Sequence, residues 1–220
     1  MIVELQKRLI TSIFLLSLLV LMFVYNYVLI ISLIIIALVS WIEFYALISK
    51  IFKKKNTENK ILRFFCKAVS LLYLSILVYL ILVPKLTNND VEIFIVYSIL
   101  VSIMSDIGGL IIGRTFKGRK LTKISPKKTI SGAIGSFIFS LCLIPIFIER
   151  LPDMSLFILF CITIIISLVS QIGDLFISYL KRIAKVKDTS DLLPGHGGVL
   201  DRIDGIIFSI PVSILILSYF

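Results

Sequence analysis

The polar run between Gln171 and Gly205 contains the side chains that metal and phosphate chemistry require. If the run begins as a helix, four polar residues fall at i, i+4, i+7 and i+11: Asp174, Ser178, Lys181 and Lys185. That spacing places a carboxylate, a hydroxyl and two ammonium groups on one helix face. The sequence therefore predicts a polar stripe that leads from an apolar helix into an aqueous loop.

The second half of this run predicts an open loop followed by two acids. Pro194 and Gly195 interrupt any helix, and Gly197 and Gly198 leave the backbone accessible. Carboxylates beside phosphate-binding groups favour Mg²⁺, which takes oxygen ligands, and the expected ligands are Asp174, Asp201 and Asp204, the last two sharing a helix face at i and i+3. Zinc is not expected, because His196 is the only histidine and no cysteine is nearby. Taken singly, each residue also has an ordinary structural explanation, such as acids at a helix N-terminus.

A second polar segment, from Gly113 to Gly132, combines glycines with seven Lys and Arg residues and the sequence SPKKT. Lysine and arginine neutralise phosphate, and a Ser or Thr at a helix start leaves N–H groups directed at an anion. Its candidate phosphate-binding residues are Arg114, Ser125, Lys127, Lys128 and Thr129. Binding to lipid headgroups is the alternative for this segment.

Asp106 precedes this segment, within the apolar run SDIGGLIIG. An acid inside a membrane span costs ~2.5 to 3.5 kcal/mol at the helix centre, so it normally faces a polar site or a partner. We expect Asp106 to face the substrate, and a salt bridge to a neighbouring helix is the structural alternative.

The rest of the chain has the composition of an all-α polytopic membrane protein. It has 220 residues, 59% of them hydrophobic and 16% charged, and a mean hydropathy of +1.08. With ~20 apolar residues per span, about seven transmembrane helices are expected in a helix bundle. They are Leu9 to Tyr25, Tyr27 to Ser49, Ala68 to Val83, Val91 to Ile112, Ile130 to Ile148, Ser155 to Phe176 and Ile203 to Phe220. Residues 1–90 would form an N-terminal region of three spans, and residues 91–220 the catalytic region.

The distribution of positive charge predicts the orientation of these spans. The net charge is +10, but the basic residues lie in short loops between apolar runs, which favours an anionic membrane surface over nucleic acid. With a cytoplasmic N-terminus, 21 of the 23 Lys and Arg residues fall on the cytoplasmic side, and only Lys85 and Arg150 lie outside. Both long polar segments would then face the cytoplasm and form two walls of one site.

The residues from Ser178 to Asp204 resemble the signature of phosphatidate cytidylyltransferases, also called CDP-diacylglycerol synthases. The matching positions are Ser178, Lys181, Arg182, Lys187, Asp188, Pro194, His196, Gly197, Gly198, Asp201, Arg202 and Asp204. The resemblance extends upstream through QIGDL, Asp106, the GR at 113–114, GRKL and ISPKKT. This sequence departs from the family pattern at Ile177 and Ser131, where members commonly have glutamate.

The resemblance implies that CTP reacts with phosphatidic acid in the bilayer to give CDP-diacylglycerol and pyrophosphate, dependent on Mg²⁺. On this hypothesis the catalytic residues are Asp174, Lys181, Arg182, His196, Asp201, Arg202 and Asp204. The substrate-binding residues would be Asp106, Arg114, Ser125, Lys127, Lys128, Thr129, Ser178, Lys187, Asp188, Gly197 and Gly198. His196 is assigned a hydrogen-bonding role, with general base as the alternative.

Two other functions remain open from the sequence. A related CTP-dependent enzyme with another lipid acceptor, such as an ether-lipid cytidylyltransferase or a polyprenol kinase, would have similar chemistry. A transporter would also have acids within its spans, although here the polar groups collect at one membrane face. The composition favours a bacterial cytoplasmic membrane, and a homodimer is compatible with the sequence.

Overall fold

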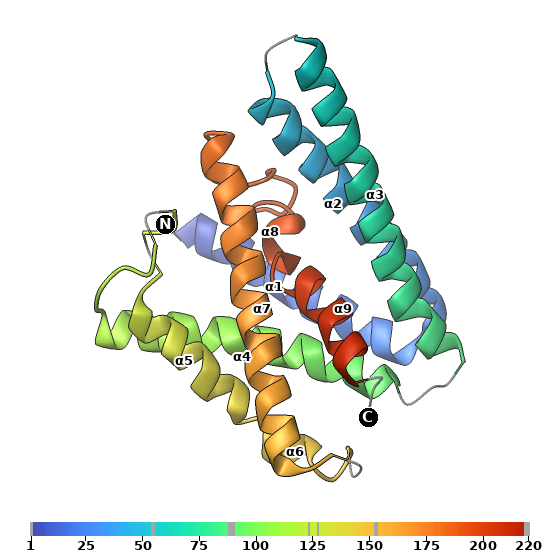
Figure 1. Ribbon diagram of the computed structural model, residues 1–220, viewed down its shortest axis with the longest axis vertical. Helices are drawn as coiled ribbons and strands as arrows, with labels where there is room; N and C mark the ends of the chain where they lie inside the picture. Colours follow the sequence, from blue (N-terminus) through green and yellow to red (C-terminus); the bar gives the residue numbers. More distant parts are fainter. Residues whose placement is uncertain are drawn as a thin grey trace. The chain divides into compact units, whose positions relative to one another are not determined.

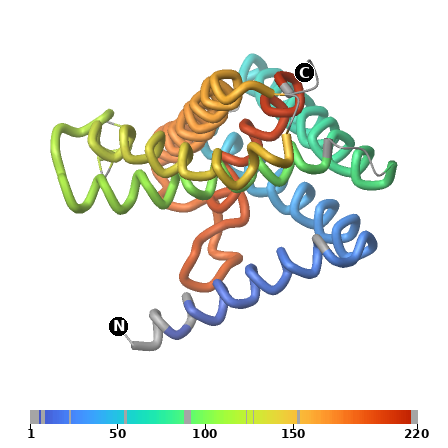
Figure 2. Tube along the Cα trace, turned by 90° about the horizontal axis from the view of Figure 1, so that it is seen from below, coloured from blue at the N-terminus to red at the C-terminus, as the bar shows by residue number. Residues whose placement is uncertain are grey.

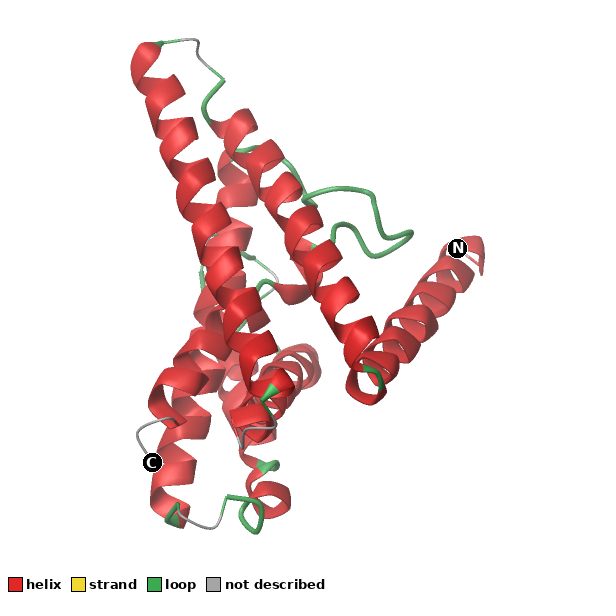
Figure 3. Ribbon diagram, turned by 90° about the vertical axis from the view of Figure 1, so that its right-hand side faces the viewer, coloured by secondary structure: helices red, strands yellow, loops and turns green. Residues whose placement is uncertain are grey.

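The computed structural model describes residues 2–53, 56–87, 91–122, 124–126, 128–151 and 154–217. Within these ranges every regular element is a helix and no strand occurs (Figures 1 and 3), so the all-α prediction is confirmed there. The helices are α1 (Ile2–Val24), α2 (Asn26–Ile51), α3 (Thr57–Leu86), α4 (Val91–Phe116), α5 (Ile130–Leu141), α6 (Ile144–Phe147), α7 (Leu156–Ile183), α8 (Leu200–Ile203) and α9 (Ile206–Leu217).

Five apolar helical segments are long enough to cross a membrane, which makes the chain an integral membrane helix bundle. They are Asn26–Ile51, Thr57–Leu86, Glu92–Phe116, Ile130–Phe147 and Leu156–Ile183. The first and last of the seven predicted spans correspond to α1, whose apolar part is Leu9–Met22, and to α9, which has 12 residues in the described part. The apolar part of α1 and the described part of α9 are each shorter than the ~20 residues of a full span. These two membrane crossings therefore remain predictions.

The chain forms two compact units. Unit 1 comprises Met1–Thr87 and Leu180–Ile203, and unit 2 comprises Asn88–Tyr179 and Asp204–Phe220. Helix α7 contributes residues to both. The division at residue 90 into an N-terminal and a catalytic region remains a prediction.

Unit 2 is built on the close packing of α4 against α5, which lie side by side (Figure 2). Glycines make this approach possible: a Cβ added at Gly135 would lie 2.4 Å from the Cβ of Ile112, and one at Gly108 would lie 2.4 Å from the carbonyl oxygen of Gly135. Small residues at such an interface let helix backbones approach closely in a membrane. An apolar core beside this interface includes Tyr97, whose hydroxyl lies 2.5 Å from Thr163 Oγ1.

Unit 1 contains the α2–α3 hairpin and the polar loop that follows α7. The ammonium group of Lys67 lies 4.4 Å from the ring centroid of Tyr45 and 5.1 Å from that of Trp41. Trp41 Nε1 also donates a hydrogen bond to the carbonyl of Lys67. These contacts join α2 and α3 near the ends of the two helices that are predicted to face the cytoplasm.

The structure corrects the prediction that Asp201 and Asp204 share one helix at the start of the last span. Helix α8 ends at Ile203 and α9 begins at Ile206, with a turn at 204–205. A Cβ at Gly205 would lie 2.5 Å from Ser170 Oγ and 3.0 Å from the Ser170 carbonyl oxygen. This tight contact with α7 requires glycine at the point where the chain turns.

Candidate functional site

Helix α7 carries most of the predicted polar stripe. It remains helical to Ile183, so Asp174, Ser178 and Lys181 lie along one helix, and Ser178 Oγ donates a hydrogen bond to Asp174 Oδ1 at 3.2 Å. Lys185 follows the end of the helix with φ of +57°. The helical stripe therefore contains three of its four predicted members and ends at Lys181, because Lys185 lies outside the helix.

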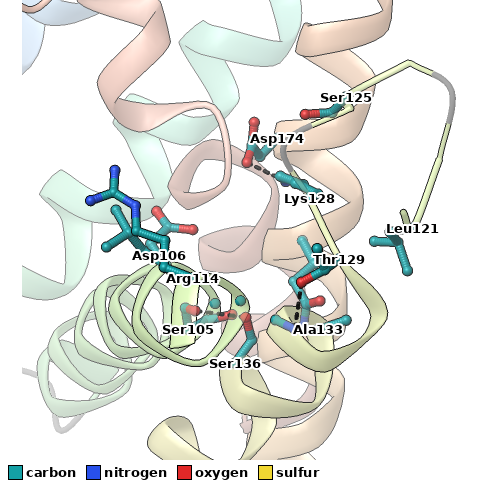
Figure 4. A pocket seen from close by; sticks show the side chains of 15 residues that line it. Ser105, Asp106, Arg114, Leu121, Ser125, Lys128, Thr129, Ala133, Ser136 and Asp174 are labelled. Carbon is teal, nitrogen blue, oxygen red and sulfur yellow. Dashed lines mark hydrogen bonds and ion pairs between the residues drawn. The ribbon is translucent and has the colours of Figure 1, made fainter. Parts of the chain in front are cut away.

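A cavity of about 390 Å³ opens in unit 2 between α4, α5, α7 and the segment before α5 (Figure 4). Six of the predicted site residues line it: Asp106, Arg114, Ser125, Lys128, Thr129 and Asp174. Asp106 and Arg114 are exposed, and they come from the cytoplasmic half predicted for α4. These six residues thus bring two cations, two hydroxyls and two carboxylates to the cavity.

An ion pair between Lys128 and Asp174 joins the two sequence segments that supply this cavity (Figure 4). Each side chain is about one quarter exposed, at 29% for Lys128 and 24% for Asp174. Because the pair is partly accessible, an incoming phosphate could take the place of the carboxylate on the Lys128 ammonium group. The neighbouring Lys127 lies outside the described residues.

Hydrogen bonds close the segment between α4 and α5 at its base. Thr129 caps α5 by accepting from the backbone N–H of Gly132 at 3.1 Å, and the N–H of Ile130 donates to the carbonyl of Arg119 at 3.0 Å. Ser131, which replaces a glutamate of the family pattern, donates from Oγ to the carbonyl of Lys117. Ser131 therefore has a loop-closing contact, while Ile177, at the other departure, is buried at 1% exposure.

Gly113 and Gly132 have a packing role that the sequence did not indicate. A Cβ at Gly113 would lie 3.0 Å from Thr129 Oγ1 and 3.4 Å from the Cα of Gly132. The two glycines bring α4 and α5 together at the edge of the cavity, which they also line. The close approach of these two glycines lets α4 and α5 pack together. This packing in turn sets the shape of the cavity edge.

In unit 1 the loop after α7 folds around the carboxylate of Asp201. Lys181 Nζ lies 2.6 Å from Asp201 Oδ1 in an ion pair whose side chains are only 11% and 3% exposed. Asp201 Oδ2 accepts from the backbone N–H groups of Thr189 at 2.8 Å and Gly198 at 3.0 Å. Burial raises the pKa of Asp201, whereas the hydrogen bonds from Lys181, Thr189 and Gly198 lower it. Together the hydrogen bonds outweigh burial, so the pKa of Asp201 lies below its ordinary value.

The PGHGG part of this loop makes a tight turn. The backbone N–H of Leu193 donates to the carbonyl of Gly197, and Gly195 and Gly197 have φ of +77° and +82°, which favour glycine. Arg202 donates from Nε and Nη2 to the carbonyl of His196, at 3.1 and 2.7 Å. Arg202 therefore supports the turn that carries His196.

Of the remaining predicted residues, Arg182, Lys187 and Asp188 precede this turn in the sequence, and Asp204 follows it. Asp188 is half-buried, and a Cβ at Gly197 would lie 3.1 Å from its Cβ. Arg182 and Lys187 are exposed. In unit 2, Asp204 is buried at 8% exposure and accepts from the N–H of Gly205 at 2.9 Å.

Sequence reasoning missed Glu43, which lies on α2 and is 4% exposed. Its carboxylate accepts hydrogen bonds from the same loop, from Ser190, Val199 and Leu200. The signal was available, because an acid within an apolar span needs a partner, the reasoning applied above to Asp106. Thr11 and Ser12 on α1 were also missed: Thr11 Oγ1 donates to the carbonyl of Pro194 at 3.0 Å, and Ser12 Oγ lies 3.4 Å from His196 Nε2.

The assignment of Asp174, Asp201 and Asp204 to Mg²⁺ stays a prediction, and two of these acids have lysine partners within their own units. Lysine ammonium groups pair with Asp174 and Asp201, and both oxygens of Asp201 accept hydrogen bonds. Among the described residues, no three His, Cys, Asp or Glu side chains lie together as a metal site. A divalent cation would have to compete with lysine for the carboxylates of Asp174 and Asp201.

Helices of membrane-spanning length define an integral membrane protein, and cations and carboxylates gather at its cavity in unit 2. Residues 2–220 match the model of the cytidylyltransferase family, and the chain belongs to that family. It is similar to phosphatidate cytidylyltransferases from several bacteria. The identity is 41% over 141 residues with that of Rickettsia prowazekii (strain Madrid E), 42% over 134 with that of Staphylococcus haemolyticus (strain JCSC1435), and 39% over 130 with that of Bacillus subtilis (strain 168).

These matches cover 60%, 60% and 58% of this chain, in the same order. They span 60%, 51% and 48% of the relatives, so the matched part is about half to three fifths of their length. The resemblance of the signature residues to this family is thereby confirmed.

Proposed function

We propose that this protein transfers the cytidylyl group of CTP to phosphatidic acid, giving CDP-diacylglycerol and pyrophosphate. One observation carries the proposal: two polar segments far apart in the sequence meet in a cavity of unit 2 through the Lys128–Asp174 pair. Cations at such a cavity suit a reaction between two phosphate compounds. The names of the similar bacterial proteins support the same reaction.

The reaction needs positive charge more than it needs a base. An oxygen of the lipid phosphate attacks the α-phosphorus of CTP, a P–O bond forms, and the bond to the β-phosphate breaks as pyrophosphate leaves with its electron pair. Phosphatidic acid is already ionised at neutral pH, so no strong base is required. Two polyanions must nevertheless approach each other, and fixed cations lower the cost of that approach.

The described cations have distinct places in this proposal. Arg114 and Lys128, with the hydroxyls of Ser125 and Thr129, would bind phosphate oxygens in the cavity of unit 2. In unit 1, Lys181 and Arg182 at the end of α7 and Arg202 on α8 would hold phosphate, and His196 would position it. Bound Mg²⁺ would neutralise charge on the leaving pyrophosphate, with Asp174, Asp201 and Asp204 as its proposed ligands.

We further propose that the site faces the cytoplasm of a bacterial cell, where CTP is found. The partition of 21 of 23 basic residues to one side supports this orientation.

The test uses membranes from cells that express the protein, given radiolabelled CTP and phosphatidic acid with Mg²⁺. The expected result is a labelled lipid that co-migrates with CDP-diacylglycerol in thin-layer chromatography and disappears with EDTA. Phosphatidic acid, an ether-linked analogue and a polyprenol are supplied in parallel. Labelling of another acceptor in place of phosphatidic acid, or no labelled lipid, would contradict the proposal.

A further inference from the structure

Glu43 is a buried acid outside the residues assigned above to phosphate or metal binding. It lies on α2, eight residues before the end of that helix at Ile51, or about 12 Å along the axis at 1.5 Å per residue. Only 4% of the residue is exposed. Because a buried charge without partners is strongly unfavourable, its surroundings indicate why it is there.

The described polar contacts of Glu43 are with the loop between α7 and α8 and with the first residue of α8. Oε1 accepts from Ser190 Oγ at 2.6 Å and from the N–H of Val199 at 3.0 Å. Oε2 accepts from the N–H of Leu200 at 2.8 Å, and the hydroxyl of Thr189 lies 2.9 Å away. The Thr189 hydroxyl is also 3.0 Å from Asp201 Oδ2, so its single proton serves one of the two carboxylates at a time.

These contacts join the two ends of one loop. Thr189 and Ser190 precede the PGHGG turn, whereas Val199 and Leu200 follow it. Glu43 therefore fixes both ends from α2, a helix more than 140 residues away in the sequence, and satisfies two backbone N–H groups at the start of α8. The turn between these ends carries His196.

Gly198 shows how closely Glu43 fits against this loop. A Cβ added at Gly198 would lie 2.5 Å from Glu43 Oε2 and 2.0 Å from Thr189 Oγ1. The second glycine of the HGG sequence is therefore required by the carboxylate of Glu43 and its partner hydroxyl. This contact explains why glycine is needed at position 198 without any contact between phosphate and the backbone there.

We propose that Glu43 is a positioning residue for the cytidylyl transfer. It holds the loop from Thr189 to Leu200 in the conformation in which Arg202 supports the His196 turn and Lys181 pairs with Asp201. It does not touch substrate in this role, since its oxygens are occupied by the loop. The proposal rests on the proposed function for its kinetic consequence, but the loop contact itself does not.

The chemistry of the contact requires a carboxylate of this length. An ionised carboxylate offers acceptor positions on both oxygens, which suits a set of partners that all donate. In Glu43→Gln, one of the two atoms becomes an NH₂ group facing a backbone N–H, which cannot reverse its polarity. In Glu43→Asp, the carboxylate is kept but withdrawn by one methylene, so partial function is expected.

The experiment compares wild type, Glu43→Gln, Glu43→Asp and the control Ser40→Ala in two assays. Ser40 is buried on the same helix, and its hydroxyl has no hydrogen-bond partner. Steady-state kinetics with CTP and phosphatidic acid in membranes give kcat and KM. Limited trypsin digestion of detergent-purified protein without substrate measures cleavage at Lys185 and Lys187, with cleavage between α2 and α3 as an internal reference.

For Glu43→Gln we expect kcat/KM to fall about tenfold or more, since hydrogen bonds to a charged group are lost. We expect cleavage at Lys185 and Lys187 to accelerate several-fold while the reference cleavage stays unchanged. Glu43→Asp should lie between Glu43→Gln and wild type, and Ser40→Ala should match wild type. A purely structural role would instead accelerate both cleavages together.

Wild-type kinetics and cleavage in Glu43→Gln would overturn the proposal, and so would equal acceleration at both cleavage regions. If Glu43→Gln does not fold, Ser190→Ala decides, because it removes one donor and keeps the acid. Trypsin should cleave the Ser190→Ala variant faster at Lys185 and Lys187 than it cleaves wild type. Equal cleavage rates at these two sites would overturn the proposal. If wild type makes no CTP-dependent lipid, the proposed function fails, while the digestion still tests the loop contact.

Discussion

Lys128 and Asp174 form an ion pair between the segment before α5 and helix α7 in unit 2. Neither side chain is deeply buried, so their pairing in the absence of substrate stabilises the protein only modestly. The pair keeps a cation at the cavity, where on the proposed function it would bind phosphate. We therefore expect its effect on catalysis to exceed its effect on stability.

Replacing Lys128 with alanine should lower kcat/KM for CTP at least about tenfold, because one phosphate-binding cation is lost and Asp174 is left to repel the substrate. Lys120→Ala in the same segment is the matched control. Lys120 is exposed and does not line the cavity. Initial rates with labelled CTP measure the effect, and equal rates for the two variants would remove Lys128 from the site.

Asp201 differs from Asp174 in being almost fully enclosed by donors of its own chain. Replacing it with asparagine leaves Lys181 without its carboxylate and Thr189 and Gly198 with a poorer acceptor. We expect Asp201→Asn to lower the melting temperature by at least about 5 °C in EDTA, since breaking a buried pair is costly. An acid that served only as a metal ligand would leave the EDTA melting curve unchanged. Asp191→Asn, at an exposed position of the same loop, is the control.

At the scale of elements, the packing of α4 against α5 in unit 2 depends on glycines, which have no side chain. The backbones of α4 and α5 approach so closely at Gly108 and Gly135 that a single methyl group has no room. In a membrane the packing of surfaces takes over much of the role that apolar burial has in water. The cavity beside this interface inherits its shape from it.

Gly135→Ala should therefore lower the melting temperature of the detergent-solubilised protein by about 2–8 °C, because overpacking strains the interface. Ile134→Ala, one position away, removes an exposed side chain and should change it little. The free cysteines would react with a thiol-reactive dye, and the one tryptophan, Trp41, lies in unit 1, so the loss of helical circular dichroism on heating is the measurement. Equal melting temperatures for the two variants would show that the interface has room.

At the scale of the whole molecule, the distribution of charge predicts which side of the membrane each loop faces. Leu192 lies exposed in the loop after α7, and Thr87 lies exposed after α3. In a background with Cys66, Cys142 and Cys161 replaced by serine, Thr87→Cys should react with an impermeant maleimide in intact cells. Leu192→Cys should react only after the membrane is opened, and labelling of Leu192→Cys in intact cells would reverse the predicted orientation.

Local features of the molecule followed from the sequence, and distant contacts did not. The helix spacing predicted that Asp174, Ser178 and Lys181 share α7, since that relation depends only on residues a few positions apart. The turn at 204–205 was missed although its Asp–Gly dipeptide is a turn signal, whereas the close contact of Gly205 with Ser170 could not be predicted from the sequence. The sequence indicated that Glu43 needs a partner, but the partners lie over 140 residues away, and nothing local marks which loop a buried acid will bind.

Ser131 closes the segment between α4 and α5 with a neutral hydroxyl where a carboxylate is common in the family. From Arg114 to Ser131 the chain has seven basic residues and no Asp or Glu, and the closing contact adds no negative charge. Next to a membrane, each such basic residue attracts anionic lipid with about 1 kcal/mol. Ser131 thus leaves the positive charge of this segment undiminished, and we expect the segment to enrich anionic lipids around the protein. Because salt screens such attraction beyond about 8 Å at physiological ionic strength, this enrichment weakens as salt rises.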